Sequence, residues 1–347
     1  MNILFTGGGT GGHLSVAKSV AEEIHLLGTH KLYYMGSTRG QDQQWFKESP
    51  LFKEKFFLES EGIVNKNLFT LPKAAFKQYK AAQQAKKIIQ SSQIQAVFSV
   101  GGYSAAPGAF GAILNHTPLF IHEQNARIGL LNKTLKPFAR EFYCSYTKDS
   151  PLRNYPVSKV FFDTQRQRTE IKKIIFLGGS QGAKFINNFA LEIAPELQKR
   201  GIKIIHQCGK NEIDDLTQAY QKQNIAPTLF AFSPNLHSFI QEADFAVSRA
   251  GASSLWELSA NGLPSLFVPY PYAAKNHQFY NAEFLVKQNL AYLTLESDLD
   301  CAKLLHIIED TQTLAKQSQG LMDTIQKGGA KDIAKSILAL NQGYNRN

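Results

Sequence analysis

The fold is decided by two glycine-rich stretches, Ile3-Leu4-Phe5-Thr6-Gly7-Gly8-Gly9-Thr10-Gly11-Gly12-His13 and Ile174-Ile175-Phe176-Leu177-Gly178-Gly179-Ser180-Gln181-Gly182-Ala183. In each, a short apolar strand runs into a glycine turn that opens a helix. Such a unit presents bare backbone N–H groups and the positive end of a helix dipole, which suits an anion such as a diphosphate. One unit in each half predicts an α/β fold of two doubly wound parallel-sheet (Rossmann-like) domains that face each other across a cleft. The alternative is that the glycines only allow a strand and a helix to pack closely.

The bulk composition indicates a globular protein with room for two cores. The chain has 347 residues, of which 43% are hydrophobic and 19% charged. Its three cysteines are widely spaced and form no metal or disulfide pattern, which favours a reducing cytosol. A strand begins by residue 3, so no signal peptide is expected, and no apolar run is long enough for a membrane span.

The positive charge is concentrated in one segment. The net charge is +10, and residues 62–122 contain six lysines and no Asp or Glu. Lys73, Lys77, Lys80 and Lys87 share one helical face, with Phe76 and Tyr79 beside them. A basic helix with aromatic neighbours is typical of binding to an anionic membrane surface. Binding to nucleic acid and a simply solvated face are the alternatives, and the absence of any known nucleic-acid module disfavours the former.

Strands and helices alternate through both halves of the chain, which predicts parallel sheets with right-handed crossovers. The polar segment 147–170 interrupts the pattern and is interpreted as an interdomain connection, with at most one short strand. We therefore place one domain at residues 1–155 and another at 156–329, and expect a C-terminal helix at about 330–347 to pack back on the first. The expected strands are 2–6, 31–35, 56–58, 96–100 and 119–122 in the first domain, and 173–177, 203–207, 228–231, 244–248 and 265–268 in the second.

The candidate site residues follow the carboxyl ends of these strands, where open α/β sheets bind their ligands. They are His13, the stretch His122-Glu123-Gln124-Asn125, Ser180, the stretch Arg249-Ala250-Gly251-Ala252-Ser253-Ser254, Glu257, and the segment from Pro269 to Gln278. His13 is either a base or a histidine that merely starts a helix. Glu257 is either an ordinary acid in the first turns of a helix or a ligand for the two hydroxyls of a ribose. The spacing contains no metal-ligand pattern, no Walker motif and no nucleophile elbow, so no cofactor and no protein-bound metal is expected.

Six motifs together resemble one family. Gly7 to His13, Gly101-Gly102-Tyr103, His122 to Asn125, Gly178 to Ala183, Arg249 to Ala252 with Glu257, and His277-Gln278 with Asn281-Ala282 occur in the order typical of the MurG family of bacterial N-acetylglucosamine transferases. The resemblance covers about residues 3–290. It implies a GT-B fold and an inverting transfer of GlcNAc from UDP-GlcNAc to the muramyl C4 hydroxyl of lipid I, which gives lipid II and UDP. It also implies a peripheral enzyme of peptidoglycan synthesis on the cytoplasmic face of the plasma membrane, with roles in cell shape and cell division.

The resemblance also implies roles for individual residues. His13 becomes the base, Tyr103 and the basic helix with Lys73, Phe76, Lys77, Tyr79, Lys80 and Lys87 lie on the acceptor and membrane side, and Glu257 binds the ribose. Asn125 and Gln278 contact the GlcNAc, and Arg249 meets the charge of the diphosphate. The remaining donor-site residues are Thr10, Gly11, Gly12, Ser180, Ser233, Ala252, Ser253, Ser254, Leu255 and Trp256. The implied partners are UDP-GlcNAc, lipid I, an anionic membrane and other cell-wall synthesis proteins, with no nucleic acid.

The sequence departs from the family in three places. Ser158 and Lys159 stand where the family usually has a linker arginine, Lys275-Asn276 replaces an acidic segment, and the stretch 60–66 differs from the family's acceptor loop. A lysine does not reproduce a guanidinium fork. Two other readings remain: another GT-B enzyme that uses a UDP-sugar (a glycolipid transferase or an epimerase), and a non-catalytic subunit that binds a nucleotide sugar.

Overall fold

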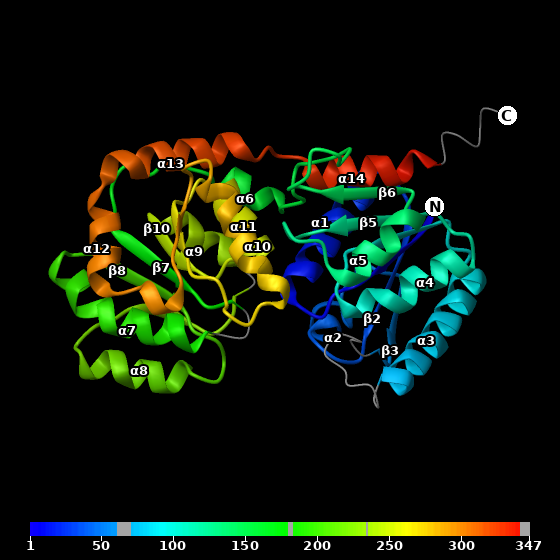
Figure 1. The fold of residues 1–347 in the computed structure, drawn as a ribbon, viewed down its shortest axis with the longest axis horizontal. Helices are drawn as coiled ribbons and strands as arrows, with labels where there is room; N and C mark the ends of the chain where they lie inside the picture. Colours follow the sequence, from blue (N-terminus) through cyan, green and yellow to red (C-terminus); the bar gives the residue numbers. More distant parts are fainter. Residues whose placement is uncertain (61–70, 180–182, 234, 341–347) are drawn as a thin grey trace. The chain divides into compact units, whose positions relative to one another are not determined.

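The computed structural model describes residues 1–60, 71–179, 183–233 and 235–340. The chain divides into two compact units, one formed by Met1–Val157 with Gly328–Asn347 and the other by Ser158–Lys327 (Figure 1). Each unit is described by itself below. The chain passes from the first unit to the second after Val157 and returns after Lys327.

The first unit is built on a six-stranded parallel sheet with the order β3-β2-β1-β4-β5-β6. Its strands are β1 (Asn2–Thr6), β2 (Lys31–Ser37), β3 (Glu54–Leu58), β4 (Ala96–Ser99), β5 (Leu119–Glu123) and β6 (Glu141–Cys144). Its helices are α1 (Gly11–Leu27), α2 (Asp42–Phe46), α3 (Leu71–Ser91), η1 (Tyr103–Ala105), α4 (Ala106–Leu114), α5 (Leu130–Leu135), η2 (Lys136–Phe138) and α14 (Gly329–Leu338). The central strands are buried along almost their whole length, because helices cover both faces of the sheet.

The second unit repeats this plan. Its six-stranded parallel sheet has the order β12-β11-β10-β7-β8-β9, which is the same winding from a central first strand. Its strands are β7 (Lys173–Leu177), β8 (Lys203–Gln207), β9 (Thr228–Phe230), β10 (Phe245–Ser248), β11 (Ser265–Phe267) and β12 (Tyr292–Leu293). Its helices are α6 (Lys159–Asp163), α7 (Lys184–Lys199), α8 (Ile213–Lys222), α9 (Leu236–Glu242), α10 (Ala252–Ala260), η3 (Ala274–Asn276), α11 (His277–Val286), η4 (Glu296–Asp298), α12 (Cys301–Glu309) and α13 (Thr311–Thr324).

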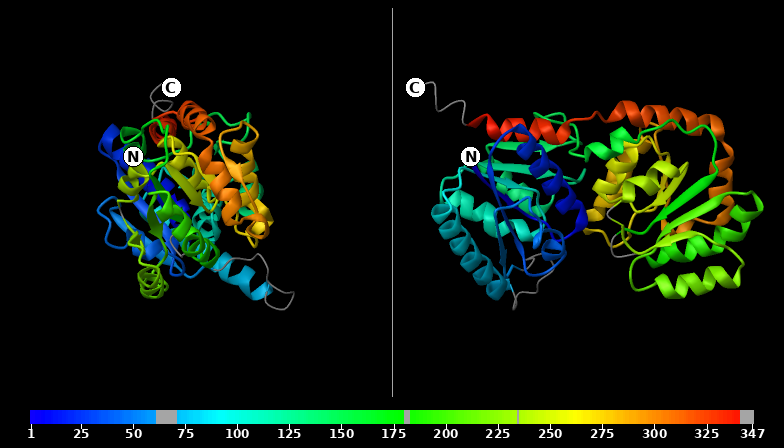
Figure 2. Two further views of the ribbon diagram at one scale, coloured as in Figure 1. Left: turned by 90° about the vertical axis from the view of Figure 1, so that its left-hand side faces the viewer. Right: turned by 180° about the vertical axis from the view of Figure 1, so that it is seen from behind.

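Two pairs of helices pack against each other in the first unit. Helices α3 and α4 pack side by side, cyan in the right-hand view of Figure 2, and bury Ala81 and Ala85. This contact leaves the opposite side of α3 to solvent.

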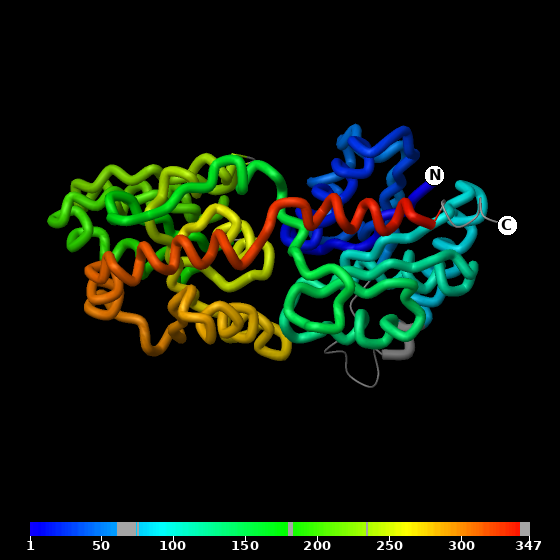
Figure 3. Tube along the Cα trace, turned by 90° about the horizontal axis from the view of Figure 1, so that it is seen from above, coloured from blue at the N-terminus to red at the C-terminus, as the bar shows by residue number. Residues whose placement is uncertain are grey.

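The C-terminal helix α14, red in Figure 3, packs on α1. It is tied to β6 because Tyr143 Oη donates to Ser336 Oγ (3.0 Å), which in turn donates to Glu141 Oε2 (2.7 Å). At its start, a Cβ on Gly329 would lie 2.5 Å from the carbonyl oxygen of Asn154, so only glycine fits this close approach.

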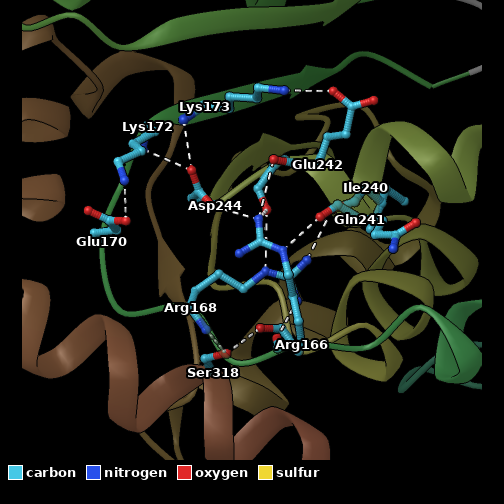
Figure 4. Close-up of polar contacts among 12 residues, drawn as sticks. Arg166, Arg168, Glu170, Lys172, Lys173, Ile240, Gln241, Glu242, Asp244 and Ser318 are labelled. Carbon is cyan, nitrogen blue, oxygen red and sulfur yellow. Dashed lines mark hydrogen bonds and ion pairs between the residues drawn. The ribbon is translucent and has the colours of Figure 1, made fainter.

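A fully buried arginine joins several segments of the second unit (Figure 4). The Arg168 guanidinium donates to the Oδ1 atom of Asn261 (2.5 Å) and to the backbone oxygens of Arg166, Ile240, Ala243 and Asn261. Most of these oxygens lie at the ends of α9 and α10, where helix carbonyls lack partners of their own. Burial lowers the pKa of Arg168 to about 9, so the guanidinium remains charged at neutral pH.

The connection between the units differs in one detail from the expectation. The segment predicted to hold at most one short strand instead contains the short helix α6. Thr164 Oγ1 and Phe161 O near its end accept hydrogen bonds of 3.0 Å from Asn261 Nδ2, which links the helix to the Arg168 cluster.

Candidate functional site

The first glycine turn is held by partners within its own unit. Its N–H groups donate to acceptors in β2, in the loop after β4, and in α2: Gly7 to Met35 O (3.4 Å), Gly8 to Gly101 O (3.2 Å) and Gly9 to Asp42 Oδ2 (2.6 Å). The expectation of bare N–H groups is therefore wrong at these three positions. The turn is a rigid support for the residues that follow it.

The carboxylate of Asp42 is the centre of this support. It is fully buried and accepts from the backbone N–H of Gly9, from the N–H of Ser37 (3.1 Å) and from Tyr34 Oη (3.0 Å). The Tyr34 hydroxyl also lies 2.9 Å from Gly7 O, and burial together with Asp42 raises the pKa of Tyr34 well above its ordinary value. Sequence reasoning missed Asp42, and its only signal was an acidic residue at a helix start.

The turn places Thr10 and His13 at the beginning of α1. Thr10 Oγ1 lies 2.9 Å from His13 Nδ1, a contact that fixes the plane of the imidazole ring. The Tyr103 ring packs against the turn, where a Cβ on Gly9 would lie 2.7 Å from its Cε1 atom. The structure therefore brings three of the predicted site residues together in the first unit.

His122 belongs to the same group of residues. It is buried at the end of β5 with its ring edge-to-face against Tyr155, at 5.3 Å between centroids. Burial, and secondarily the charge of His13, lowers the pKa of His122 to about 3. His122 is therefore neutral at physiological pH.

The next residue, Glu123, organises the segment that carries Asn125. Its carboxylate accepts from the backbone N–H groups of Asn125 and Gly129 (2.9 Å each) and from Asn132 Nδ2 (3.0 Å). The side chain of Glu123 is buried and acts on the chain rather than on a ligand. Asn125 is thereby held directly after β5, as the sequence analysis places it.

The second glycine turn is described only in part. Gly178 N–H lies 3.4 Å from Gln207 O, and α7 begins at Lys184. Ser180, predicted to contact the phosphates, lies outside the described residues. In the first turn of α7, Asn187 Oδ1 bonds to His206 Nε2 (2.9 Å), and His206 Nδ1 bonds to Tyr220 Oη (3.0 Å). These contacts anchor the start of α7 to β8 and α8.

Helix α10 carries the predicted nucleotide-binding residues. Glu257 is its sixth residue and is partly exposed, whereas the side chains of Leu255 and Trp256 are buried. Trp256 packs on Phe284 of α11 at 5.9 Å between ring centroids. Leu255 and Trp256 thus belong to the core of the second unit, whereas Ser254 and Glu257 are polar and partly exposed.

The other predicted donor-site residues of this unit have defined surroundings. Ser233 Oγ accepts from the N–H of Asn235 (3.0 Å) just before α9. Gln278 Oε1 accepts from the N–H of Tyr270 (2.9 Å), and Arg249 forms an ion pair with Glu296 at 2.5 Å. The sequence analysis assigns the Arg249 guanidinium to the charge of the diphosphate. In the structure this guanidinium is instead paired with a carboxylate of the protein itself.

The basic face of α3 is exposed where the structure describes its side chains. Phe76 and Tyr79 expose 57% and 59% of their surface, and Lys80 Nζ lies 4.7 Å above the Phe76 ring. Lys80 and Lys87 are exposed and Lys77 is half-buried, whereas the side chain of Lys73 lies outside the described residues. Within the described chain, no helix combines the length and apolar character that a membrane span requires.

No metal cluster is found in the described part of either unit. Nowhere in residues 1–60, 71–179, 183–233 and 235–340 do three or more His, Cys, Asp or Glu side chains gather where they could hold an ion.

Family models match both units. The glycosyltransferase family 28 N-terminal domain matches residues 3–144, and the glycosyltransferase family 28 C-terminal domain matches residues 173–337. The solved structure of MurG from Acinetobacter baumannii superposes with a TM-score of 0.77 at 25% identity, over 97% of this chain and 98% of that one. The Staphylococcus aureus MnaA–UDP complex superposes with a TM-score of 0.68 over 98% and 97% of the two chains, and at 11% identity it supports the fold alone. The chain is a glycosyltransferase with the two-domain GT-B fold.

Relatives in sequence show to which family of glycosyltransferases the chain belongs. Two proteins named UDP-N-acetylglucosamine–N-acetylmuramyl-(pentapeptide) pyrophosphoryl-undecaprenol N-acetylglucosamine transferase are close in sequence. The one from Wolinella succinogenes is 48% identical over 339 residues, which is 98% of this chain and 100% of the relative. The one from Campylobacter jejuni strain 81-176 is 46% identical over 346 residues and all of both chains. The chain belongs to this family, the MurG family, as its motifs indicate.

Proposed function

We propose that this protein transfers GlcNAc from UDP-GlcNAc to the muramyl C4 hydroxyl of lipid I, with inversion at the sugar, and releases lipid II and UDP. The observation that carries the proposal is the arrangement at the start of α1, where the Asp42-supported turn holds Thr10 and His13 together. A protein that only binds a nucleotide sugar has no need of an oriented histidine in this position. The relatives at 46–48% identity carry the corresponding transferase name.

His13 acts as the general base in this proposal. If Nδ1–H donates to Thr10 Oγ1, Nε2 keeps its lone pair and can take the proton of the acceptor hydroxyl. As it loses this proton, the acceptor oxygen attacks the anomeric carbon of GlcNAc, and the bond from that carbon to the diphosphate breaks. The transition state resembles an oxocarbenium ion, and negative charge grows on the departing UDP.

The second unit binds the donor. Glu257 accepts hydrogen bonds from the ribose hydroxyls, Gln278 contacts the GlcNAc, and the N-terminal end of α7 stabilises the diphosphate. We propose that this helix end takes the place of a bound metal, so that the chemical step requires no metal ion.

The basic and aromatic face of α3 binds the membrane that carries the acceptor. Lys80 and Lys87 are exposed beside Phe76 and Tyr79, and cationic side chains near anionic lipid contribute about 1 kcal/mol each. In this proposal the protein works peripherally on the cytoplasmic leaflet, where cell-wall synthesis, cell shape and cell division require lipid II.

The test is transfer of radiolabelled GlcNAc from UDP-GlcNAc to a soluble lipid I analogue, with diacylglycerol and no acceptor as parallel reactions. We expect label only in the lipid I product, and we expect EDTA to leave the rate unchanged. Label on diacylglycerol indicates a glycolipid transferase, and a changed UDP-sugar without acceptor indicates an epimerase. Loss of transfer in EDTA with recovery in Mg²⁺ would contradict the metal-independent step.

A further inference from the structure

Arg249 spans the carboxyl ends of three neighbouring strands in the second unit. It follows β10, whereas its ion-pair partner Glu296 follows β12, and β11 lies between these two strands. Arg249 Nη2 lies 2.5 Å from Glu296 Oε1, and Nη1 donates to Val268 O (3.1 Å) and Pro269 O (3.2 Å), the two residues directly after β11. Adjacent strands lie about 4.8 Å apart, so two long side chains are needed to bridge this distance.

Aromatic rings also contact the guanidinium. Its Cζ atom lies 6.0 Å from the Phe185 ring centroid and 5.6 Å from that of Tyr270. The Arg249 side chain is only 12% exposed and that of Glu296 28%. A guanidinium bound by a carboxylate, two carbonyls and two rings is held in one place, and it holds the segment after β11 in return.

That segment determines how Gln278 is oriented. Tyr270, which packs on Arg249, donates its backbone N–H to Gln278 Oε1 at 2.9 Å. A backbone N–H can only donate, so this contact fixes which end of the carboxamide is oxygen. Gln278 therefore offers its NH₂ group as the donor to a ligand.

We propose that Arg249 and Glu296 are positioning residues that orient Gln278 as a hydrogen-bond donor to an oxygen of the donor sugar. The pair acts through the backbone of residues 268–270 and touches neither the nucleotide nor the reacting atoms. Glu296 lies outside all six motifs of the sequence. The inference rests on the proposed function, since it assigns Gln278 to the sugar of UDP-GlcNAc.

Binding of UDP-GlcNAc and of UDP, measured in parallel by calorimetry, separates this role from a general structural one. Glu296→Gln keeps the size of the side chain and removes its charge. It should weaken UDP-GlcNAc binding about 2- to 30-fold and leave UDP binding unchanged. Gln278→Ala should show the same selectivity, and the double variant should lose no more than Gln278→Ala alone.

Glu283→Gln is the matched control. It makes the same chemical change in an ion pair on the surface of α11, where Glu283 Oε2 lies 2.9 Å from Lys287 Nζ, and it should change neither affinity. If Glu296→Gln does not fold, Glu296→Asp keeps the charge, shortens the bridge by one methylene and allows the same comparison.

Three outcomes would overturn the inference: unchanged UDP-GlcNAc binding in the Glu296 variant, equal losses for UDP and UDP-GlcNAc, or additive losses in the double variant. These outcomes differ from a failure of the proposed function, which would be seen in the parent protein. The parent would then bind UDP-GlcNAc no better than UDP-glucose and would transfer no label to the lipid I analogue.

Discussion

The carboxylate of Asp42 lies 2.6 Å from the backbone nitrogen of Gly9 and is fully buried beneath the first glycine turn. An internal anion thus occupies one of the N–H groups that a glycine turn would otherwise offer to a phosphate. The first turn therefore serves to position Thr10 and His13. In the proposed function the diphosphate is bound at the start of α7 in the second unit, and the predicted donor contacts of Thr10, Gly11 and Gly12 in the first turn stay predictions.

Asp42→Asn should destabilise the first unit. An asparagine offers one acceptor oxygen and places an NH₂ group where the second oxygen accepted, so at least one buried N–H loses its partner. The expected loss is about 1–3 kcal/mol in the free energy of unfolding, measured by urea titration. Tyr34→Phe, which removes a single donor to the same carboxylate, should cost less. An Asp42→Asn protein as stable as the parent would show that the carboxylate does not support the turn.

His206 should make the second unit sensitive to acid. Burial lowers the pKa of His206 to about 4, whereas an exposed histidine in the unfolded chain titrates near 6.5. Between these values the unfolded chain binds a proton that the folded chain does not, so stability falls as the pH drops from about 6.5 to 4. The loss from this group by pH 4.5 is about 2–3 kcal/mol.

His206→Gln is the variant that tests this. Its amide reaches the Nε2 position beside Asn187 but does not titrate. Urea unfolding at pH 7.5 and pH 4.5 should show a smaller difference for the variant than for the parent. Equal differences in the two proteins would mean that His206 is not neutral when folded.

Much of the fold follows from the sequence because its signals are local. Apolar strands ending in glycine turns predict β1 and β7, and the alternation of strands and helices predicts two parallel sheets, both of which the structure confirms. The strands that escaped prediction, β6 and β12, lie at sheet edges and are short. Edge strands need less apolar sequence, and their existence depends on a neighbour that is distant in the chain.

The site residues also differ in whether local sequence signals can predict them. Residues within the glycine turns and directly after strands can be found from sequence, since the turn and the strand end place them. Asp42, Arg168 and Glu296 cannot, because each acts through partners in other elements, such as the contact of Arg168 with Asn261. Most charged residues are exposed, so a single charged residue in a sequence is expected on the surface unless its partners in the fold are known.

Glu257→Ala should weaken binding of UDP-GlcNAc by about 1.5–3 kcal/mol, the usual contribution of hydrogen bonds to a charged group. UDP should lose as much, because the ribose is common to both ligands, and this distinguishes Glu257 from Gln278. Calorimetry with both ligands measures the two values. Unchanged affinity would remove Glu257 from the site and leave it as an acid on the surface of α10.

Replacing Lys73, Lys77, Lys80 and Lys87 with glutamate should reduce binding to anionic vesicles by roughly 1 kcal/mol or more for each charge near the surface. Affinity for UDP-GlcNAc should stay the same, since α3 carries none of the predicted donor-site residues. The control makes the same charge change at Lys203, Lys210, Lys222 and Lys331, which are exposed elsewhere. Equal vesicle sedimentation of the α3 variant and the parent would mean that this face is only solvated.

His13→Ala should lower kcat by about 10²–10⁴-fold, the usual contribution of a general base, and leave the affinity for UDP-GlcNAc nearly unchanged. The reason is that the base acts on the acceptor hydroxyl and makes no contact that the nucleotide requires. His13→Asn separates chemistry from packing, because asparagine can keep the hydrogen bond to Thr10 Oγ1 but does not accept a proton at neutral pH. A kcat close to that of the parent in His13→Asn would show that the histidine only positions substrate. The kcat of Thr10→Val should fall between those of the parent and His13→Ala. This variant removes the hydrogen bond that orients the imidazole ring but leaves its basic nitrogen in place.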